Sequence, residues 1–146
     1  MDIQIISEPL HLTIAGFGGA APNKDYAGTA FALSGRMWKV VKAKSISNKG
    51  QNVWVYGQAD HVFAGVELID PADAAKAGLE QLQLNLEQYA YYKHVGPYNL
   101  LRQVGQNMIQ EITRRGLQTT LPHVEIYGHW TPDESKLETE LLMSVR

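Results

Sequence analysis

The run VEIYG, from Val124 to Gly128, combines a carboxylate and an aromatic ring in a pattern that could hold a charged ligand. It reads as a β-strand, because β-branched side chains alternate with larger groups and a glycine closes the run. Side chains alternate between the faces of a strand, so Val124 and Ile126 share one face and Glu125 and Tyr127 share the other. A carboxylate on a largely buried, aromatic-lined face costs free energy unless something compensates it. We therefore predict that an external cation, bound as a ligand, compensates Glu125.

The same pattern occurs earlier in the chain as VWVYG, with Trp54 in the place of Glu125 and Tyr56 in the place of Tyr127. Further pairs of segments also match, namely 65–69 with 139–143 and 12–17 with 91–96. These correspondences predict two copies of one unit, residues 1–70 and 71–146, related by a pseudo-twofold axis within a single domain over residues 1–146. For Trp54 and Tyr56, ordinary cross-strand packing is the alternative to a place in the pocket.

Composition narrows the class of protein. The chain has 146 residues, 45% of them hydrophobic, so it can bury a core of its own as one domain. Its net charge of −2 and the absence of a basic run argue against a nucleic-acid-binding surface. The lack of cysteine excludes disulfides, thiolate metal sites and a cysteine nucleophile. No signal-peptide pattern and no apolar run of membrane-spanning length occur, so we expect a cytoplasmic protein without a membrane contact.

Hydrophobic periodicity and turn residues give each unit a strand, a helix and a two-stranded hairpin. The strands expected in the first unit are one strand over 3–17 interrupted at Pro9, one from 53 and one over 61–69. Its other segments are a glycine-rich loop over 16–22, a helix over about 24–44 and a polar loop over 45–52. The second unit should contain a short edge strand over 79–86, a strand over 88–94, a helix from 97 to about 115, a loop over 118–121, and strands around 125 and over 137–145.

The expected fold class is therefore α+β. Duplicated strand-helix-strand-strand units form an antiparallel sheet with two helices on one face and a central ligand groove. The open face of the sheet, or the cleft where the units meet, is left to hold a ligand. The histidines show no HExxH or other metal spacing, and no GxSxG nucleophile elbow occurs. We expect no metal, no cofactor and no catalytic residue of these types.

Residues 89–98 (YAYYKHVGPY), followed by a helix, Gly116, the pair LP at 121–122 and EIY at 125–127, resemble the GyrI-like small-molecule-binding domain. This is the effector-binding domain of AraC-type and multidrug-responsive MerR-type regulators. The chain resembles the stand-alone versions, some of which are encoded by integron gene cassettes. The resemblance implies a duplicated fold with a central groove, in which one strand glutamate surrounded by aromatic rings contacts cationic ligands. Glu125 matches that glutamate.

The pocket walls follow less directly from the resemblance. Tyr127 falls on the face of Glu125, while Trp54, Tyr56 and Tyr91 are assigned through the alignment of the two units. Whether Tyr91 or Tyr92 points toward the pocket depends on the strand register. Trp130, in a turn, is assigned as a rim residue, with an oligomer contact as the alternative. The sequence lacks the helix-turn-helix of the regulators, so we expect no direct nucleic-acid binding and keep a regulatory protein partner open.

Three functions are compatible with these features. The first is binding of small, hydrophobic, mostly cationic compounds in an aromatic pocket around Glu125, for sequestration or for presentation to a partner. The second is a small-molecule hydrolase, with Glu125 as general base and Tyr91 or Tyr127 as proton donor. The third is a protein-interaction module of the gyrase-inhibitor type.

Overall fold

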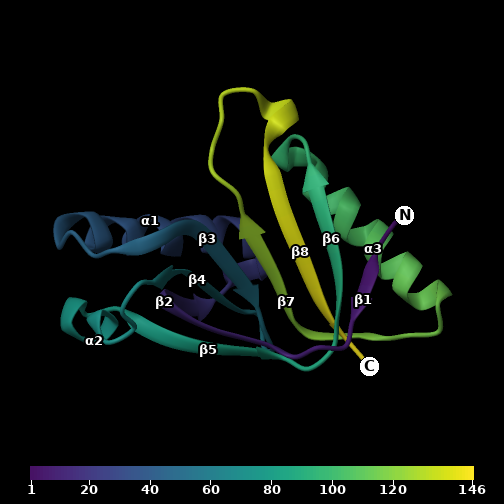
Figure 1. The fold of residues 1–146 in the computed structure, drawn as a ribbon, viewed down its shortest axis with the longest axis horizontal. Helices are drawn as coiled ribbons and strands as arrows, with labels where there is room; N and C mark the ends of the chain where they lie inside the picture. The colour runs from purple at the N-terminus through teal and green to yellow at the C-terminus, as the bar shows by residue number, and fades with distance from the viewer.

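The two units form one continuous antiparallel sheet of eight strands in the computed structural model, which describes residues 1–146 (Figure 1). The strands are β1 (Gln4–Ile6), β2 (Leu10–Ala20), β3 (Asn48–Tyr56), β4 (His61–Leu68), β5 (Glu80–Leu86), β6 (Tyr89–Val95), β7 (Thr119–Tyr127) and β8 (Glu138–Val145). The helices are α1 (Tyr26–Ala43), α2 (Asp73–Ala77) and α3 (Leu101–Arg114). Short 3₁₀ turns, η1 (Pro22–Lys24), η2 (Tyr98–Leu100) and η3 (Glu134–Lys136), complete the chain. The predicted α+β fold class is confirmed.

The order of the strands shows the internal duplication. It runs β1-β6-β8-β7-β3-β4-β2-β5, so the two units meet where β3 pairs with β7. At this junction Trp54 and Glu125 are Cα partners, and they occupy equivalent positions in the two repeated pentapeptides. The pseudo-twofold axis therefore passes beside Glu125, which places equivalent side chains of both units around it.

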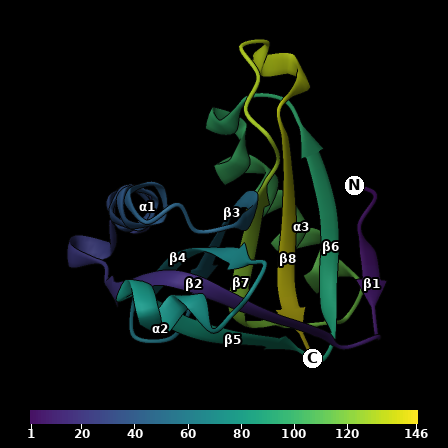
Figure 2. The ribbon, with the colours of Figure 1, turned by 60° about the vertical axis from the view of Figure 1, so that its left-hand side comes forward.

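Each unit also supplies an edge strand to the other unit (Figure 2). β1 pairs with β6, whereas β2 pairs with β4 and β5. The expectation of a single strand interrupted at Pro9 was therefore wrong, because the chain changes partners there. Proline has no N–H to donate to a ladder, which suits a position between two strands. β5 lies at the opposite end of the sheet, as the sequence predicted for an edge strand.

Three segments expected as loops belong to strands instead. The last residues of β2 and the first residues of β3 and β7 pair within the sheet. In β2 a Cβ at Gly16 would lie 1.9 Å from the carbonyl oxygen of Ala64, so glycine permits a close approach between strands here. In β3 and β7 the register shifts, between Asn48 and Asn52 and between Thr119 and His123. Such bulged strands tolerate the polar residues that made these segments look like loops.

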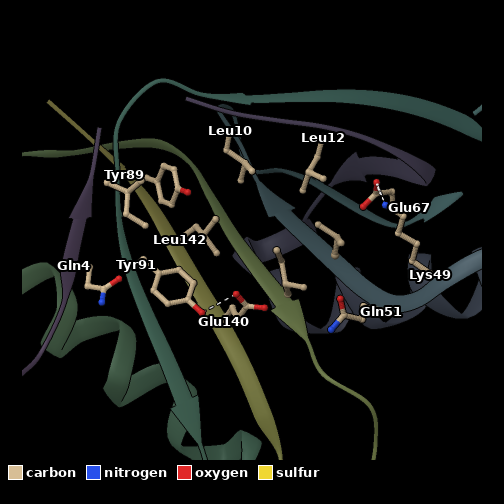
Figure 3. A pocket seen from close by; sticks show the side chains of 13 residues that line it. Gln4, Leu10, Leu12, Lys49, Gln51, Glu67, Tyr89, Tyr91, Glu140 and Leu142 are labelled. Atoms are coloured by element: carbon tan, nitrogen blue, oxygen red, sulfur yellow. Dashed lines mark hydrogen bonds and ion pairs between the residues drawn. The ribbon is translucent and has the colours of Figure 1, made fainter. Parts of the chain in front are cut away.

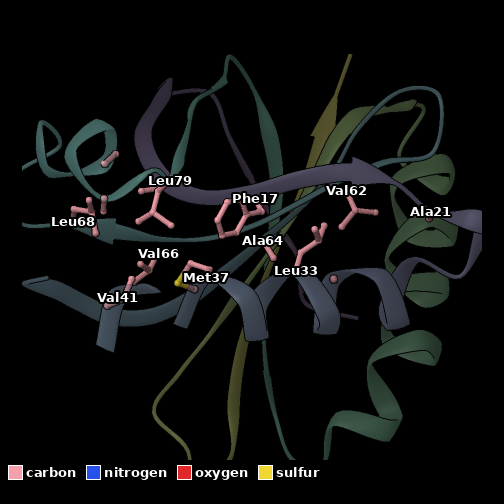
Figure 4. Packing of buried hydrophobic residues seen from close by; sticks show 14 residues of the cluster. Phe17, Ala21, Leu33, Met37, Val41, Val62, Ala64, Val66, Leu68 and Leu79 are labelled. Atoms are coloured by element: carbon pink, nitrogen blue, oxygen red, sulfur yellow. The ribbon is translucent and has the colours of Figure 1, made fainter. Parts of the chain in front are cut away.

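Helices α1 and α3 cover the same face of the sheet, one over each half (Figures 1 and 2). Helix α1 begins after Asp25, whose side chain caps it, and buries Leu33, Met37 and Val41 against β2 and β4 (Figure 4). Helix α3 packs its apolar side against β6 and β8. A third cluster, which includes Val124 and residues of β2, β3 and β5, fills the opposite face. The strip of β3 and β7 between the helices remains open, and it carries the site.

No helix of this structure is both long and apolar enough to cross a bilayer.

Candidate functional site

A cavity of about 1480 Å³ lies on the helical face, between α1 and α3. Its floor is the central pair β3 and β7, which places Trp54, Tyr56, Glu125 and Tyr127 on one surface. This follows from strand alternation, since the intervening Val124 packs in the cluster on the other face. The predicted alternation of the VEIYG run is thus confirmed, and the cleft between the units holds the cavity.

Glu125 receives one hydroxyl from each unit of the repeat. Tyr56 Oη donates to Glu125 Oε1 at 2.6 Å, and Tyr127 Oη donates to the same oxygen at 3.0 Å. The two tyrosines occupy equivalent positions in the repeat, and their hydroxyls both donate to the same carboxylate oxygen. The other oxygen, Oε2, accepts no hydrogen bond and is not among the enclosed polar atoms, so it is open to the cavity.

The protein supplies no positive partner to this carboxylate. No Lys, Arg or His nitrogen lies within 4 Å of it. Burial raises the pKa of Glu125, and the hydrogen bonds from Tyr56 and Tyr127 oppose that rise. Burial also raises the pKa of both tyrosines, and the carboxylate adds to the effect, so their hydroxyls remain protonated donors. The hydroxyl dipoles of Tyr56 and Tyr127 are therefore the groups that stabilise the Glu125 carboxylate, which can accept a proton or bind a cation.

Aromatic rings surround the carboxylate on both sides of the axis. The ring centroids of Trp54 and Tyr127 are 4.8 Å apart, and Tyr98 meets Tyr127 edge to face at 5.5 Å. On the other side, Tyr26 meets Tyr56 edge to face at 6.3 Å. Sequence analysis did not assign Tyr26 or Tyr98 to the site. The available signal was their matching place, at the start of the helical segment in each unit.

All three tryptophans of the chain line the cavity. Trp38, on α1, packs on the α1 core and also faces the cavity. Its Nε1 donates to Asn52 Oδ1 at 2.6 Å, and Ser34 Oγ donates to the same atom at 3.1 Å. Trp54 Nε1 is buried without a hydrogen-bond partner. Trp130 is 73% exposed and lines the outer part of the cavity.

Other charged groups at the cavity lie toward its outside. Asp25, Lys24 and Arg102 are exposed, and Asp60 accepts a hydrogen bond from Tyr26 Oη at 2.6 Å. No group of three or more His, Asp or Glu side chains is arranged to hold a metal ion. The single charge on the cavity floor is therefore that of Glu125.

Tyr91 does not belong to this cavity. It pairs with Leu142 across the sheet and faces the side opposite the helices, whereas Glu125 pairs with Leu141 and faces the helical side. Its hydroxyl donates to Glu140 Oε2 at 2.7 Å in a second, smaller cavity (Figure 3). The alignment of the two units assigned Tyr91 to the pocket around Glu125, but the register of β6 turns it to the other face.

No protein-family model and no curated protein matches the sequence. Solved structures do share the fold. SAV2435, determined with tetraphenylphosphonium bound, has a TM-score of 0.70 at 19% identity, with 100% of this chain and 94% of that chain covered. The EcmrR C-terminal domain has a TM-score of 0.71 at 15% identity, with 100% and 99% covered. An integron cassette protein from the mobile metagenome of Vibrio cholerae has a TM-score of 0.58 at 16% identity, with 99% of this chain and 95% of that chain covered.

A hydrolase from Listeria innocua also has this fold, with a TM-score of 0.60 at 13% identity and 99% and 91% of the chains covered. At these identities the likeness establishes a shared fold. The expected fold is thereby confirmed. Function has to be argued from the side chains of the site.

Proposed function

We propose that this chain is a GyrI-like domain that binds small lipophilic cations between α1 and α3, with Glu125 as the counter-charge. The observation that carries the proposal is the largely buried carboxylate on an aromatic floor, held by two tyrosine hydroxyls and paired with no protein cation. The cation bound by SAV2435, which shares the fold, supports the same ligand class here.

The energetics favour a bulky, delocalised cation. A unit charge about 5 Å from the carboxylate gains about 3 kcal/mol at an effective dielectric constant near 20. Each aromatic face in contact adds about 0.5–2 kcal/mol of cation–π attraction. A volume of about 1480 Å³ exceeds that of most small-molecule sites, so the ligand fills it by surface contact with flat rings rather than by directional hydrogen bonds. Such a site tolerates several ligand shapes.

The charge role can be tested with two probes of the same shape and opposite charge, tetraphenylphosphonium and tetraphenylborate. Because all three tryptophans line the cavity, quenching of intrinsic fluorescence reports binding directly. Glu125→Gln should weaken binding of the phosphonium by about 100-fold, from the Coulomb gain above, and should leave the borate unchanged or tighter. Glu80→Gln, at an exposed position of the edge strand β5, is the matched control. Equal losses for both probes, or no phosphonium binding by the wild type, would refute the proposal.

Hydrolysis is the second candidate, favoured by the raised pKa of Glu125, which suits a general base. The hydroxyls beside it belong to Tyr56 and Tyr127, since Tyr91 lies on the other face. Burial raises the pKa of both and makes them weak proton donors, so we rank binding first. Release of p-nitrophenol from p-nitrophenyl acetate by the wild type but not by Glu125→Gln would favour the hydrolase. Equal background rates would leave binding as the function.

A further inference from the structure

The second cavity lies on the face of the sheet opposite the helices and has a volume of about 450 Å³ (Figure 3). It lies where β1, β2 and β6 face the central strands. Six of its 13 lining side chains are aliphatic, namely those of Ile6, Leu10, Leu12, Val53, Ile126 and Leu142. The two rings are those of Tyr89 and Tyr91. Its volume falls within the usual range for a small-molecule site.

One carboxylate in this cavity has no positive partner. Glu140, on β8, accepts the hydroxyl of Tyr91 on Oε2 at 2.7 Å, and no hydrogen bond reaches Oε1. Burial and Glu140 together raise the pKa of Tyr91 to about 12, so this hydroxyl remains a donor at neutral pH. Neither oxygen of Glu140 lies within 4 Å of a Lys, Arg or His nitrogen. As at Glu125, a phenol holds one oxygen and leaves the other open.

The nearby ammonium groups are bound elsewhere. Lys93 is the cross-strand neighbour of Glu140 in β6, but its Nζ pairs with Glu138 at 3.1 Å. Across the cavity, Lys49 Nζ pairs with Glu67 at 2.7 Å. The lining thus holds two carboxylates and one ammonium group, which leaves a net negative charge at Glu140.

We propose that this cavity is a second ligand site, specific for slender primary amines with an aliphatic or single-ring tail. The ammonium group would lie at Glu140, and the tail would contact the leucine and isoleucine wall. A primary ammonium fits better than a quaternary one, because it has N–H groups to donate to the carboxylate and a quaternary one has none. The cavity is about one-third as large as the one on the helical face, and no tryptophan lines it, so it favours a more slender ligand than the cations proposed there.

The two sites are separable by experiment, because they lie on opposite faces of the same strands. Glu125 faces the helical side, while its neighbour Ile126 faces the second cavity. No tryptophan lines the second cavity, so a ligand there should not quench tryptophan fluorescence. Methyl groups line it on several sides and can report binding by NMR. A failure of this proposal can therefore be distinguished from a failure of the function proposed for the helical face.

The test is a methyl NMR titration of the wild-type chain with n-hexylamine, with 1-hexanol as the uncharged probe. We expect shifts at the methyls of Leu10, Leu12 and Leu142, and an affinity for the amine at least tenfold above that for the alcohol. Glu140→Gln should lower the affinity for the amine at least tenfold, whereas Glu125→Gln should leave it unchanged. Shifts confined to methyls of the larger cavity, equal affinity for amine and alcohol, or wild-type affinity in Glu140→Gln would overturn the proposal.

A second variant guards against misfolding of Glu140→Gln. Lys93 is the cross-strand neighbour of Glu140, so its positive charge, although paired with Glu138, opposes the binding of an ammonium group at Glu140. Lys93→Gln should therefore raise the affinity for hexylamine about two- to fivefold, on the scale of an exposed ion pair. A lower affinity in Lys93→Gln would contradict the assignment of Glu140 as the ammonium site.

Discussion

Tyr56→Phe should change the pH dependence of cation binding without removing an aromatic wall. The substitution deletes the shorter of the two hydrogen bonds to Glu125, the one of 2.6 Å, and keeps the ring. These bonds lower the pKa of Glu125 against the rise that burial causes. Without this donor the carboxyl group takes up a proton at a higher pH. A cation needs the ionised form, so the variant should lose its ligand at a higher pH than the wild type does.

The size of the effect follows from the charged hydrogen bond. Such a bond contributes about 1.5–3 kcal/mol, and a tenfold change in an equilibrium corresponds to about 1.4 kcal/mol. The midpoint of the binding profile should therefore move upward by about one to two pH units. Tyr127→Phe should move it less, because that bond is longer, at 3.0 Å. Well above the midpoint both variants should bind as the wild type does.

The assay is tryptophan quenching by tetraphenylphosphonium, titrated at intervals between about pH 4 and pH 9. Glu125→Gln serves as the control, with weak binding at every pH. Burial lowers the pKa of His123, which also lines the cavity, so any pH dependence left in this variant reports that ring. An unchanged midpoint in Tyr56→Phe, or a loss of affinity of the same size at every pH, would refute the reasoning. The tyrosine would then act as a packing wall and not as the group that keeps Glu125 ionised.

Three further results are expected. Gly16→Ala should prevent stable folding or strongly lower the midpoint of thermal unfolding, because the new Cβ would collide with the Ala64 carbonyl. Gly19→Ala is the control in the same strand, because its new Cβ meets no atom within 4 Å and the variant should fold normally. Burial raises the pKa of Glu125 in the folded state above its value in the unfolded chain. Between these two pKa values the native state holds a proton that the unfolded chain has lost, so the wild type loses stability as the pH rises through that range. The stability of Glu125→Gln relative to the wild type, measured by urea unfolding, should therefore increase from pH 5 to pH 8, and a constant difference would contradict this. Gly35→Trp, on α1 facing the cavity with open space around it, should weaken phosphonium binding more than tenfold while leaving the unfolding midpoint within a few degrees.

The sequence alone determined the features that depend on local alternation and on the duplication. The VEIYG run placed Glu125 and Tyr127 on one face of a strand, and its earlier copy placed Trp54 and Tyr56 in the equivalent positions. Both follow from the two-residue period of a strand, which needs no knowledge of its neighbours. The main helices and the α+β class followed from periodicity in the same way.

Only the tertiary structure decided which of these surfaces meet. Tyr56 and Glu125 are 69 residues apart, and their contact depends on the pairing of β3 with β7. Tyr91 faces away from Glu125 because the register of β6 against β8 sets its face, and a shift of one residue would reverse it. Gly16 and the bulged ends of β3 and β7 looked like loops, because close approach and register shifts arise between strands and leave no periodic signal within one strand.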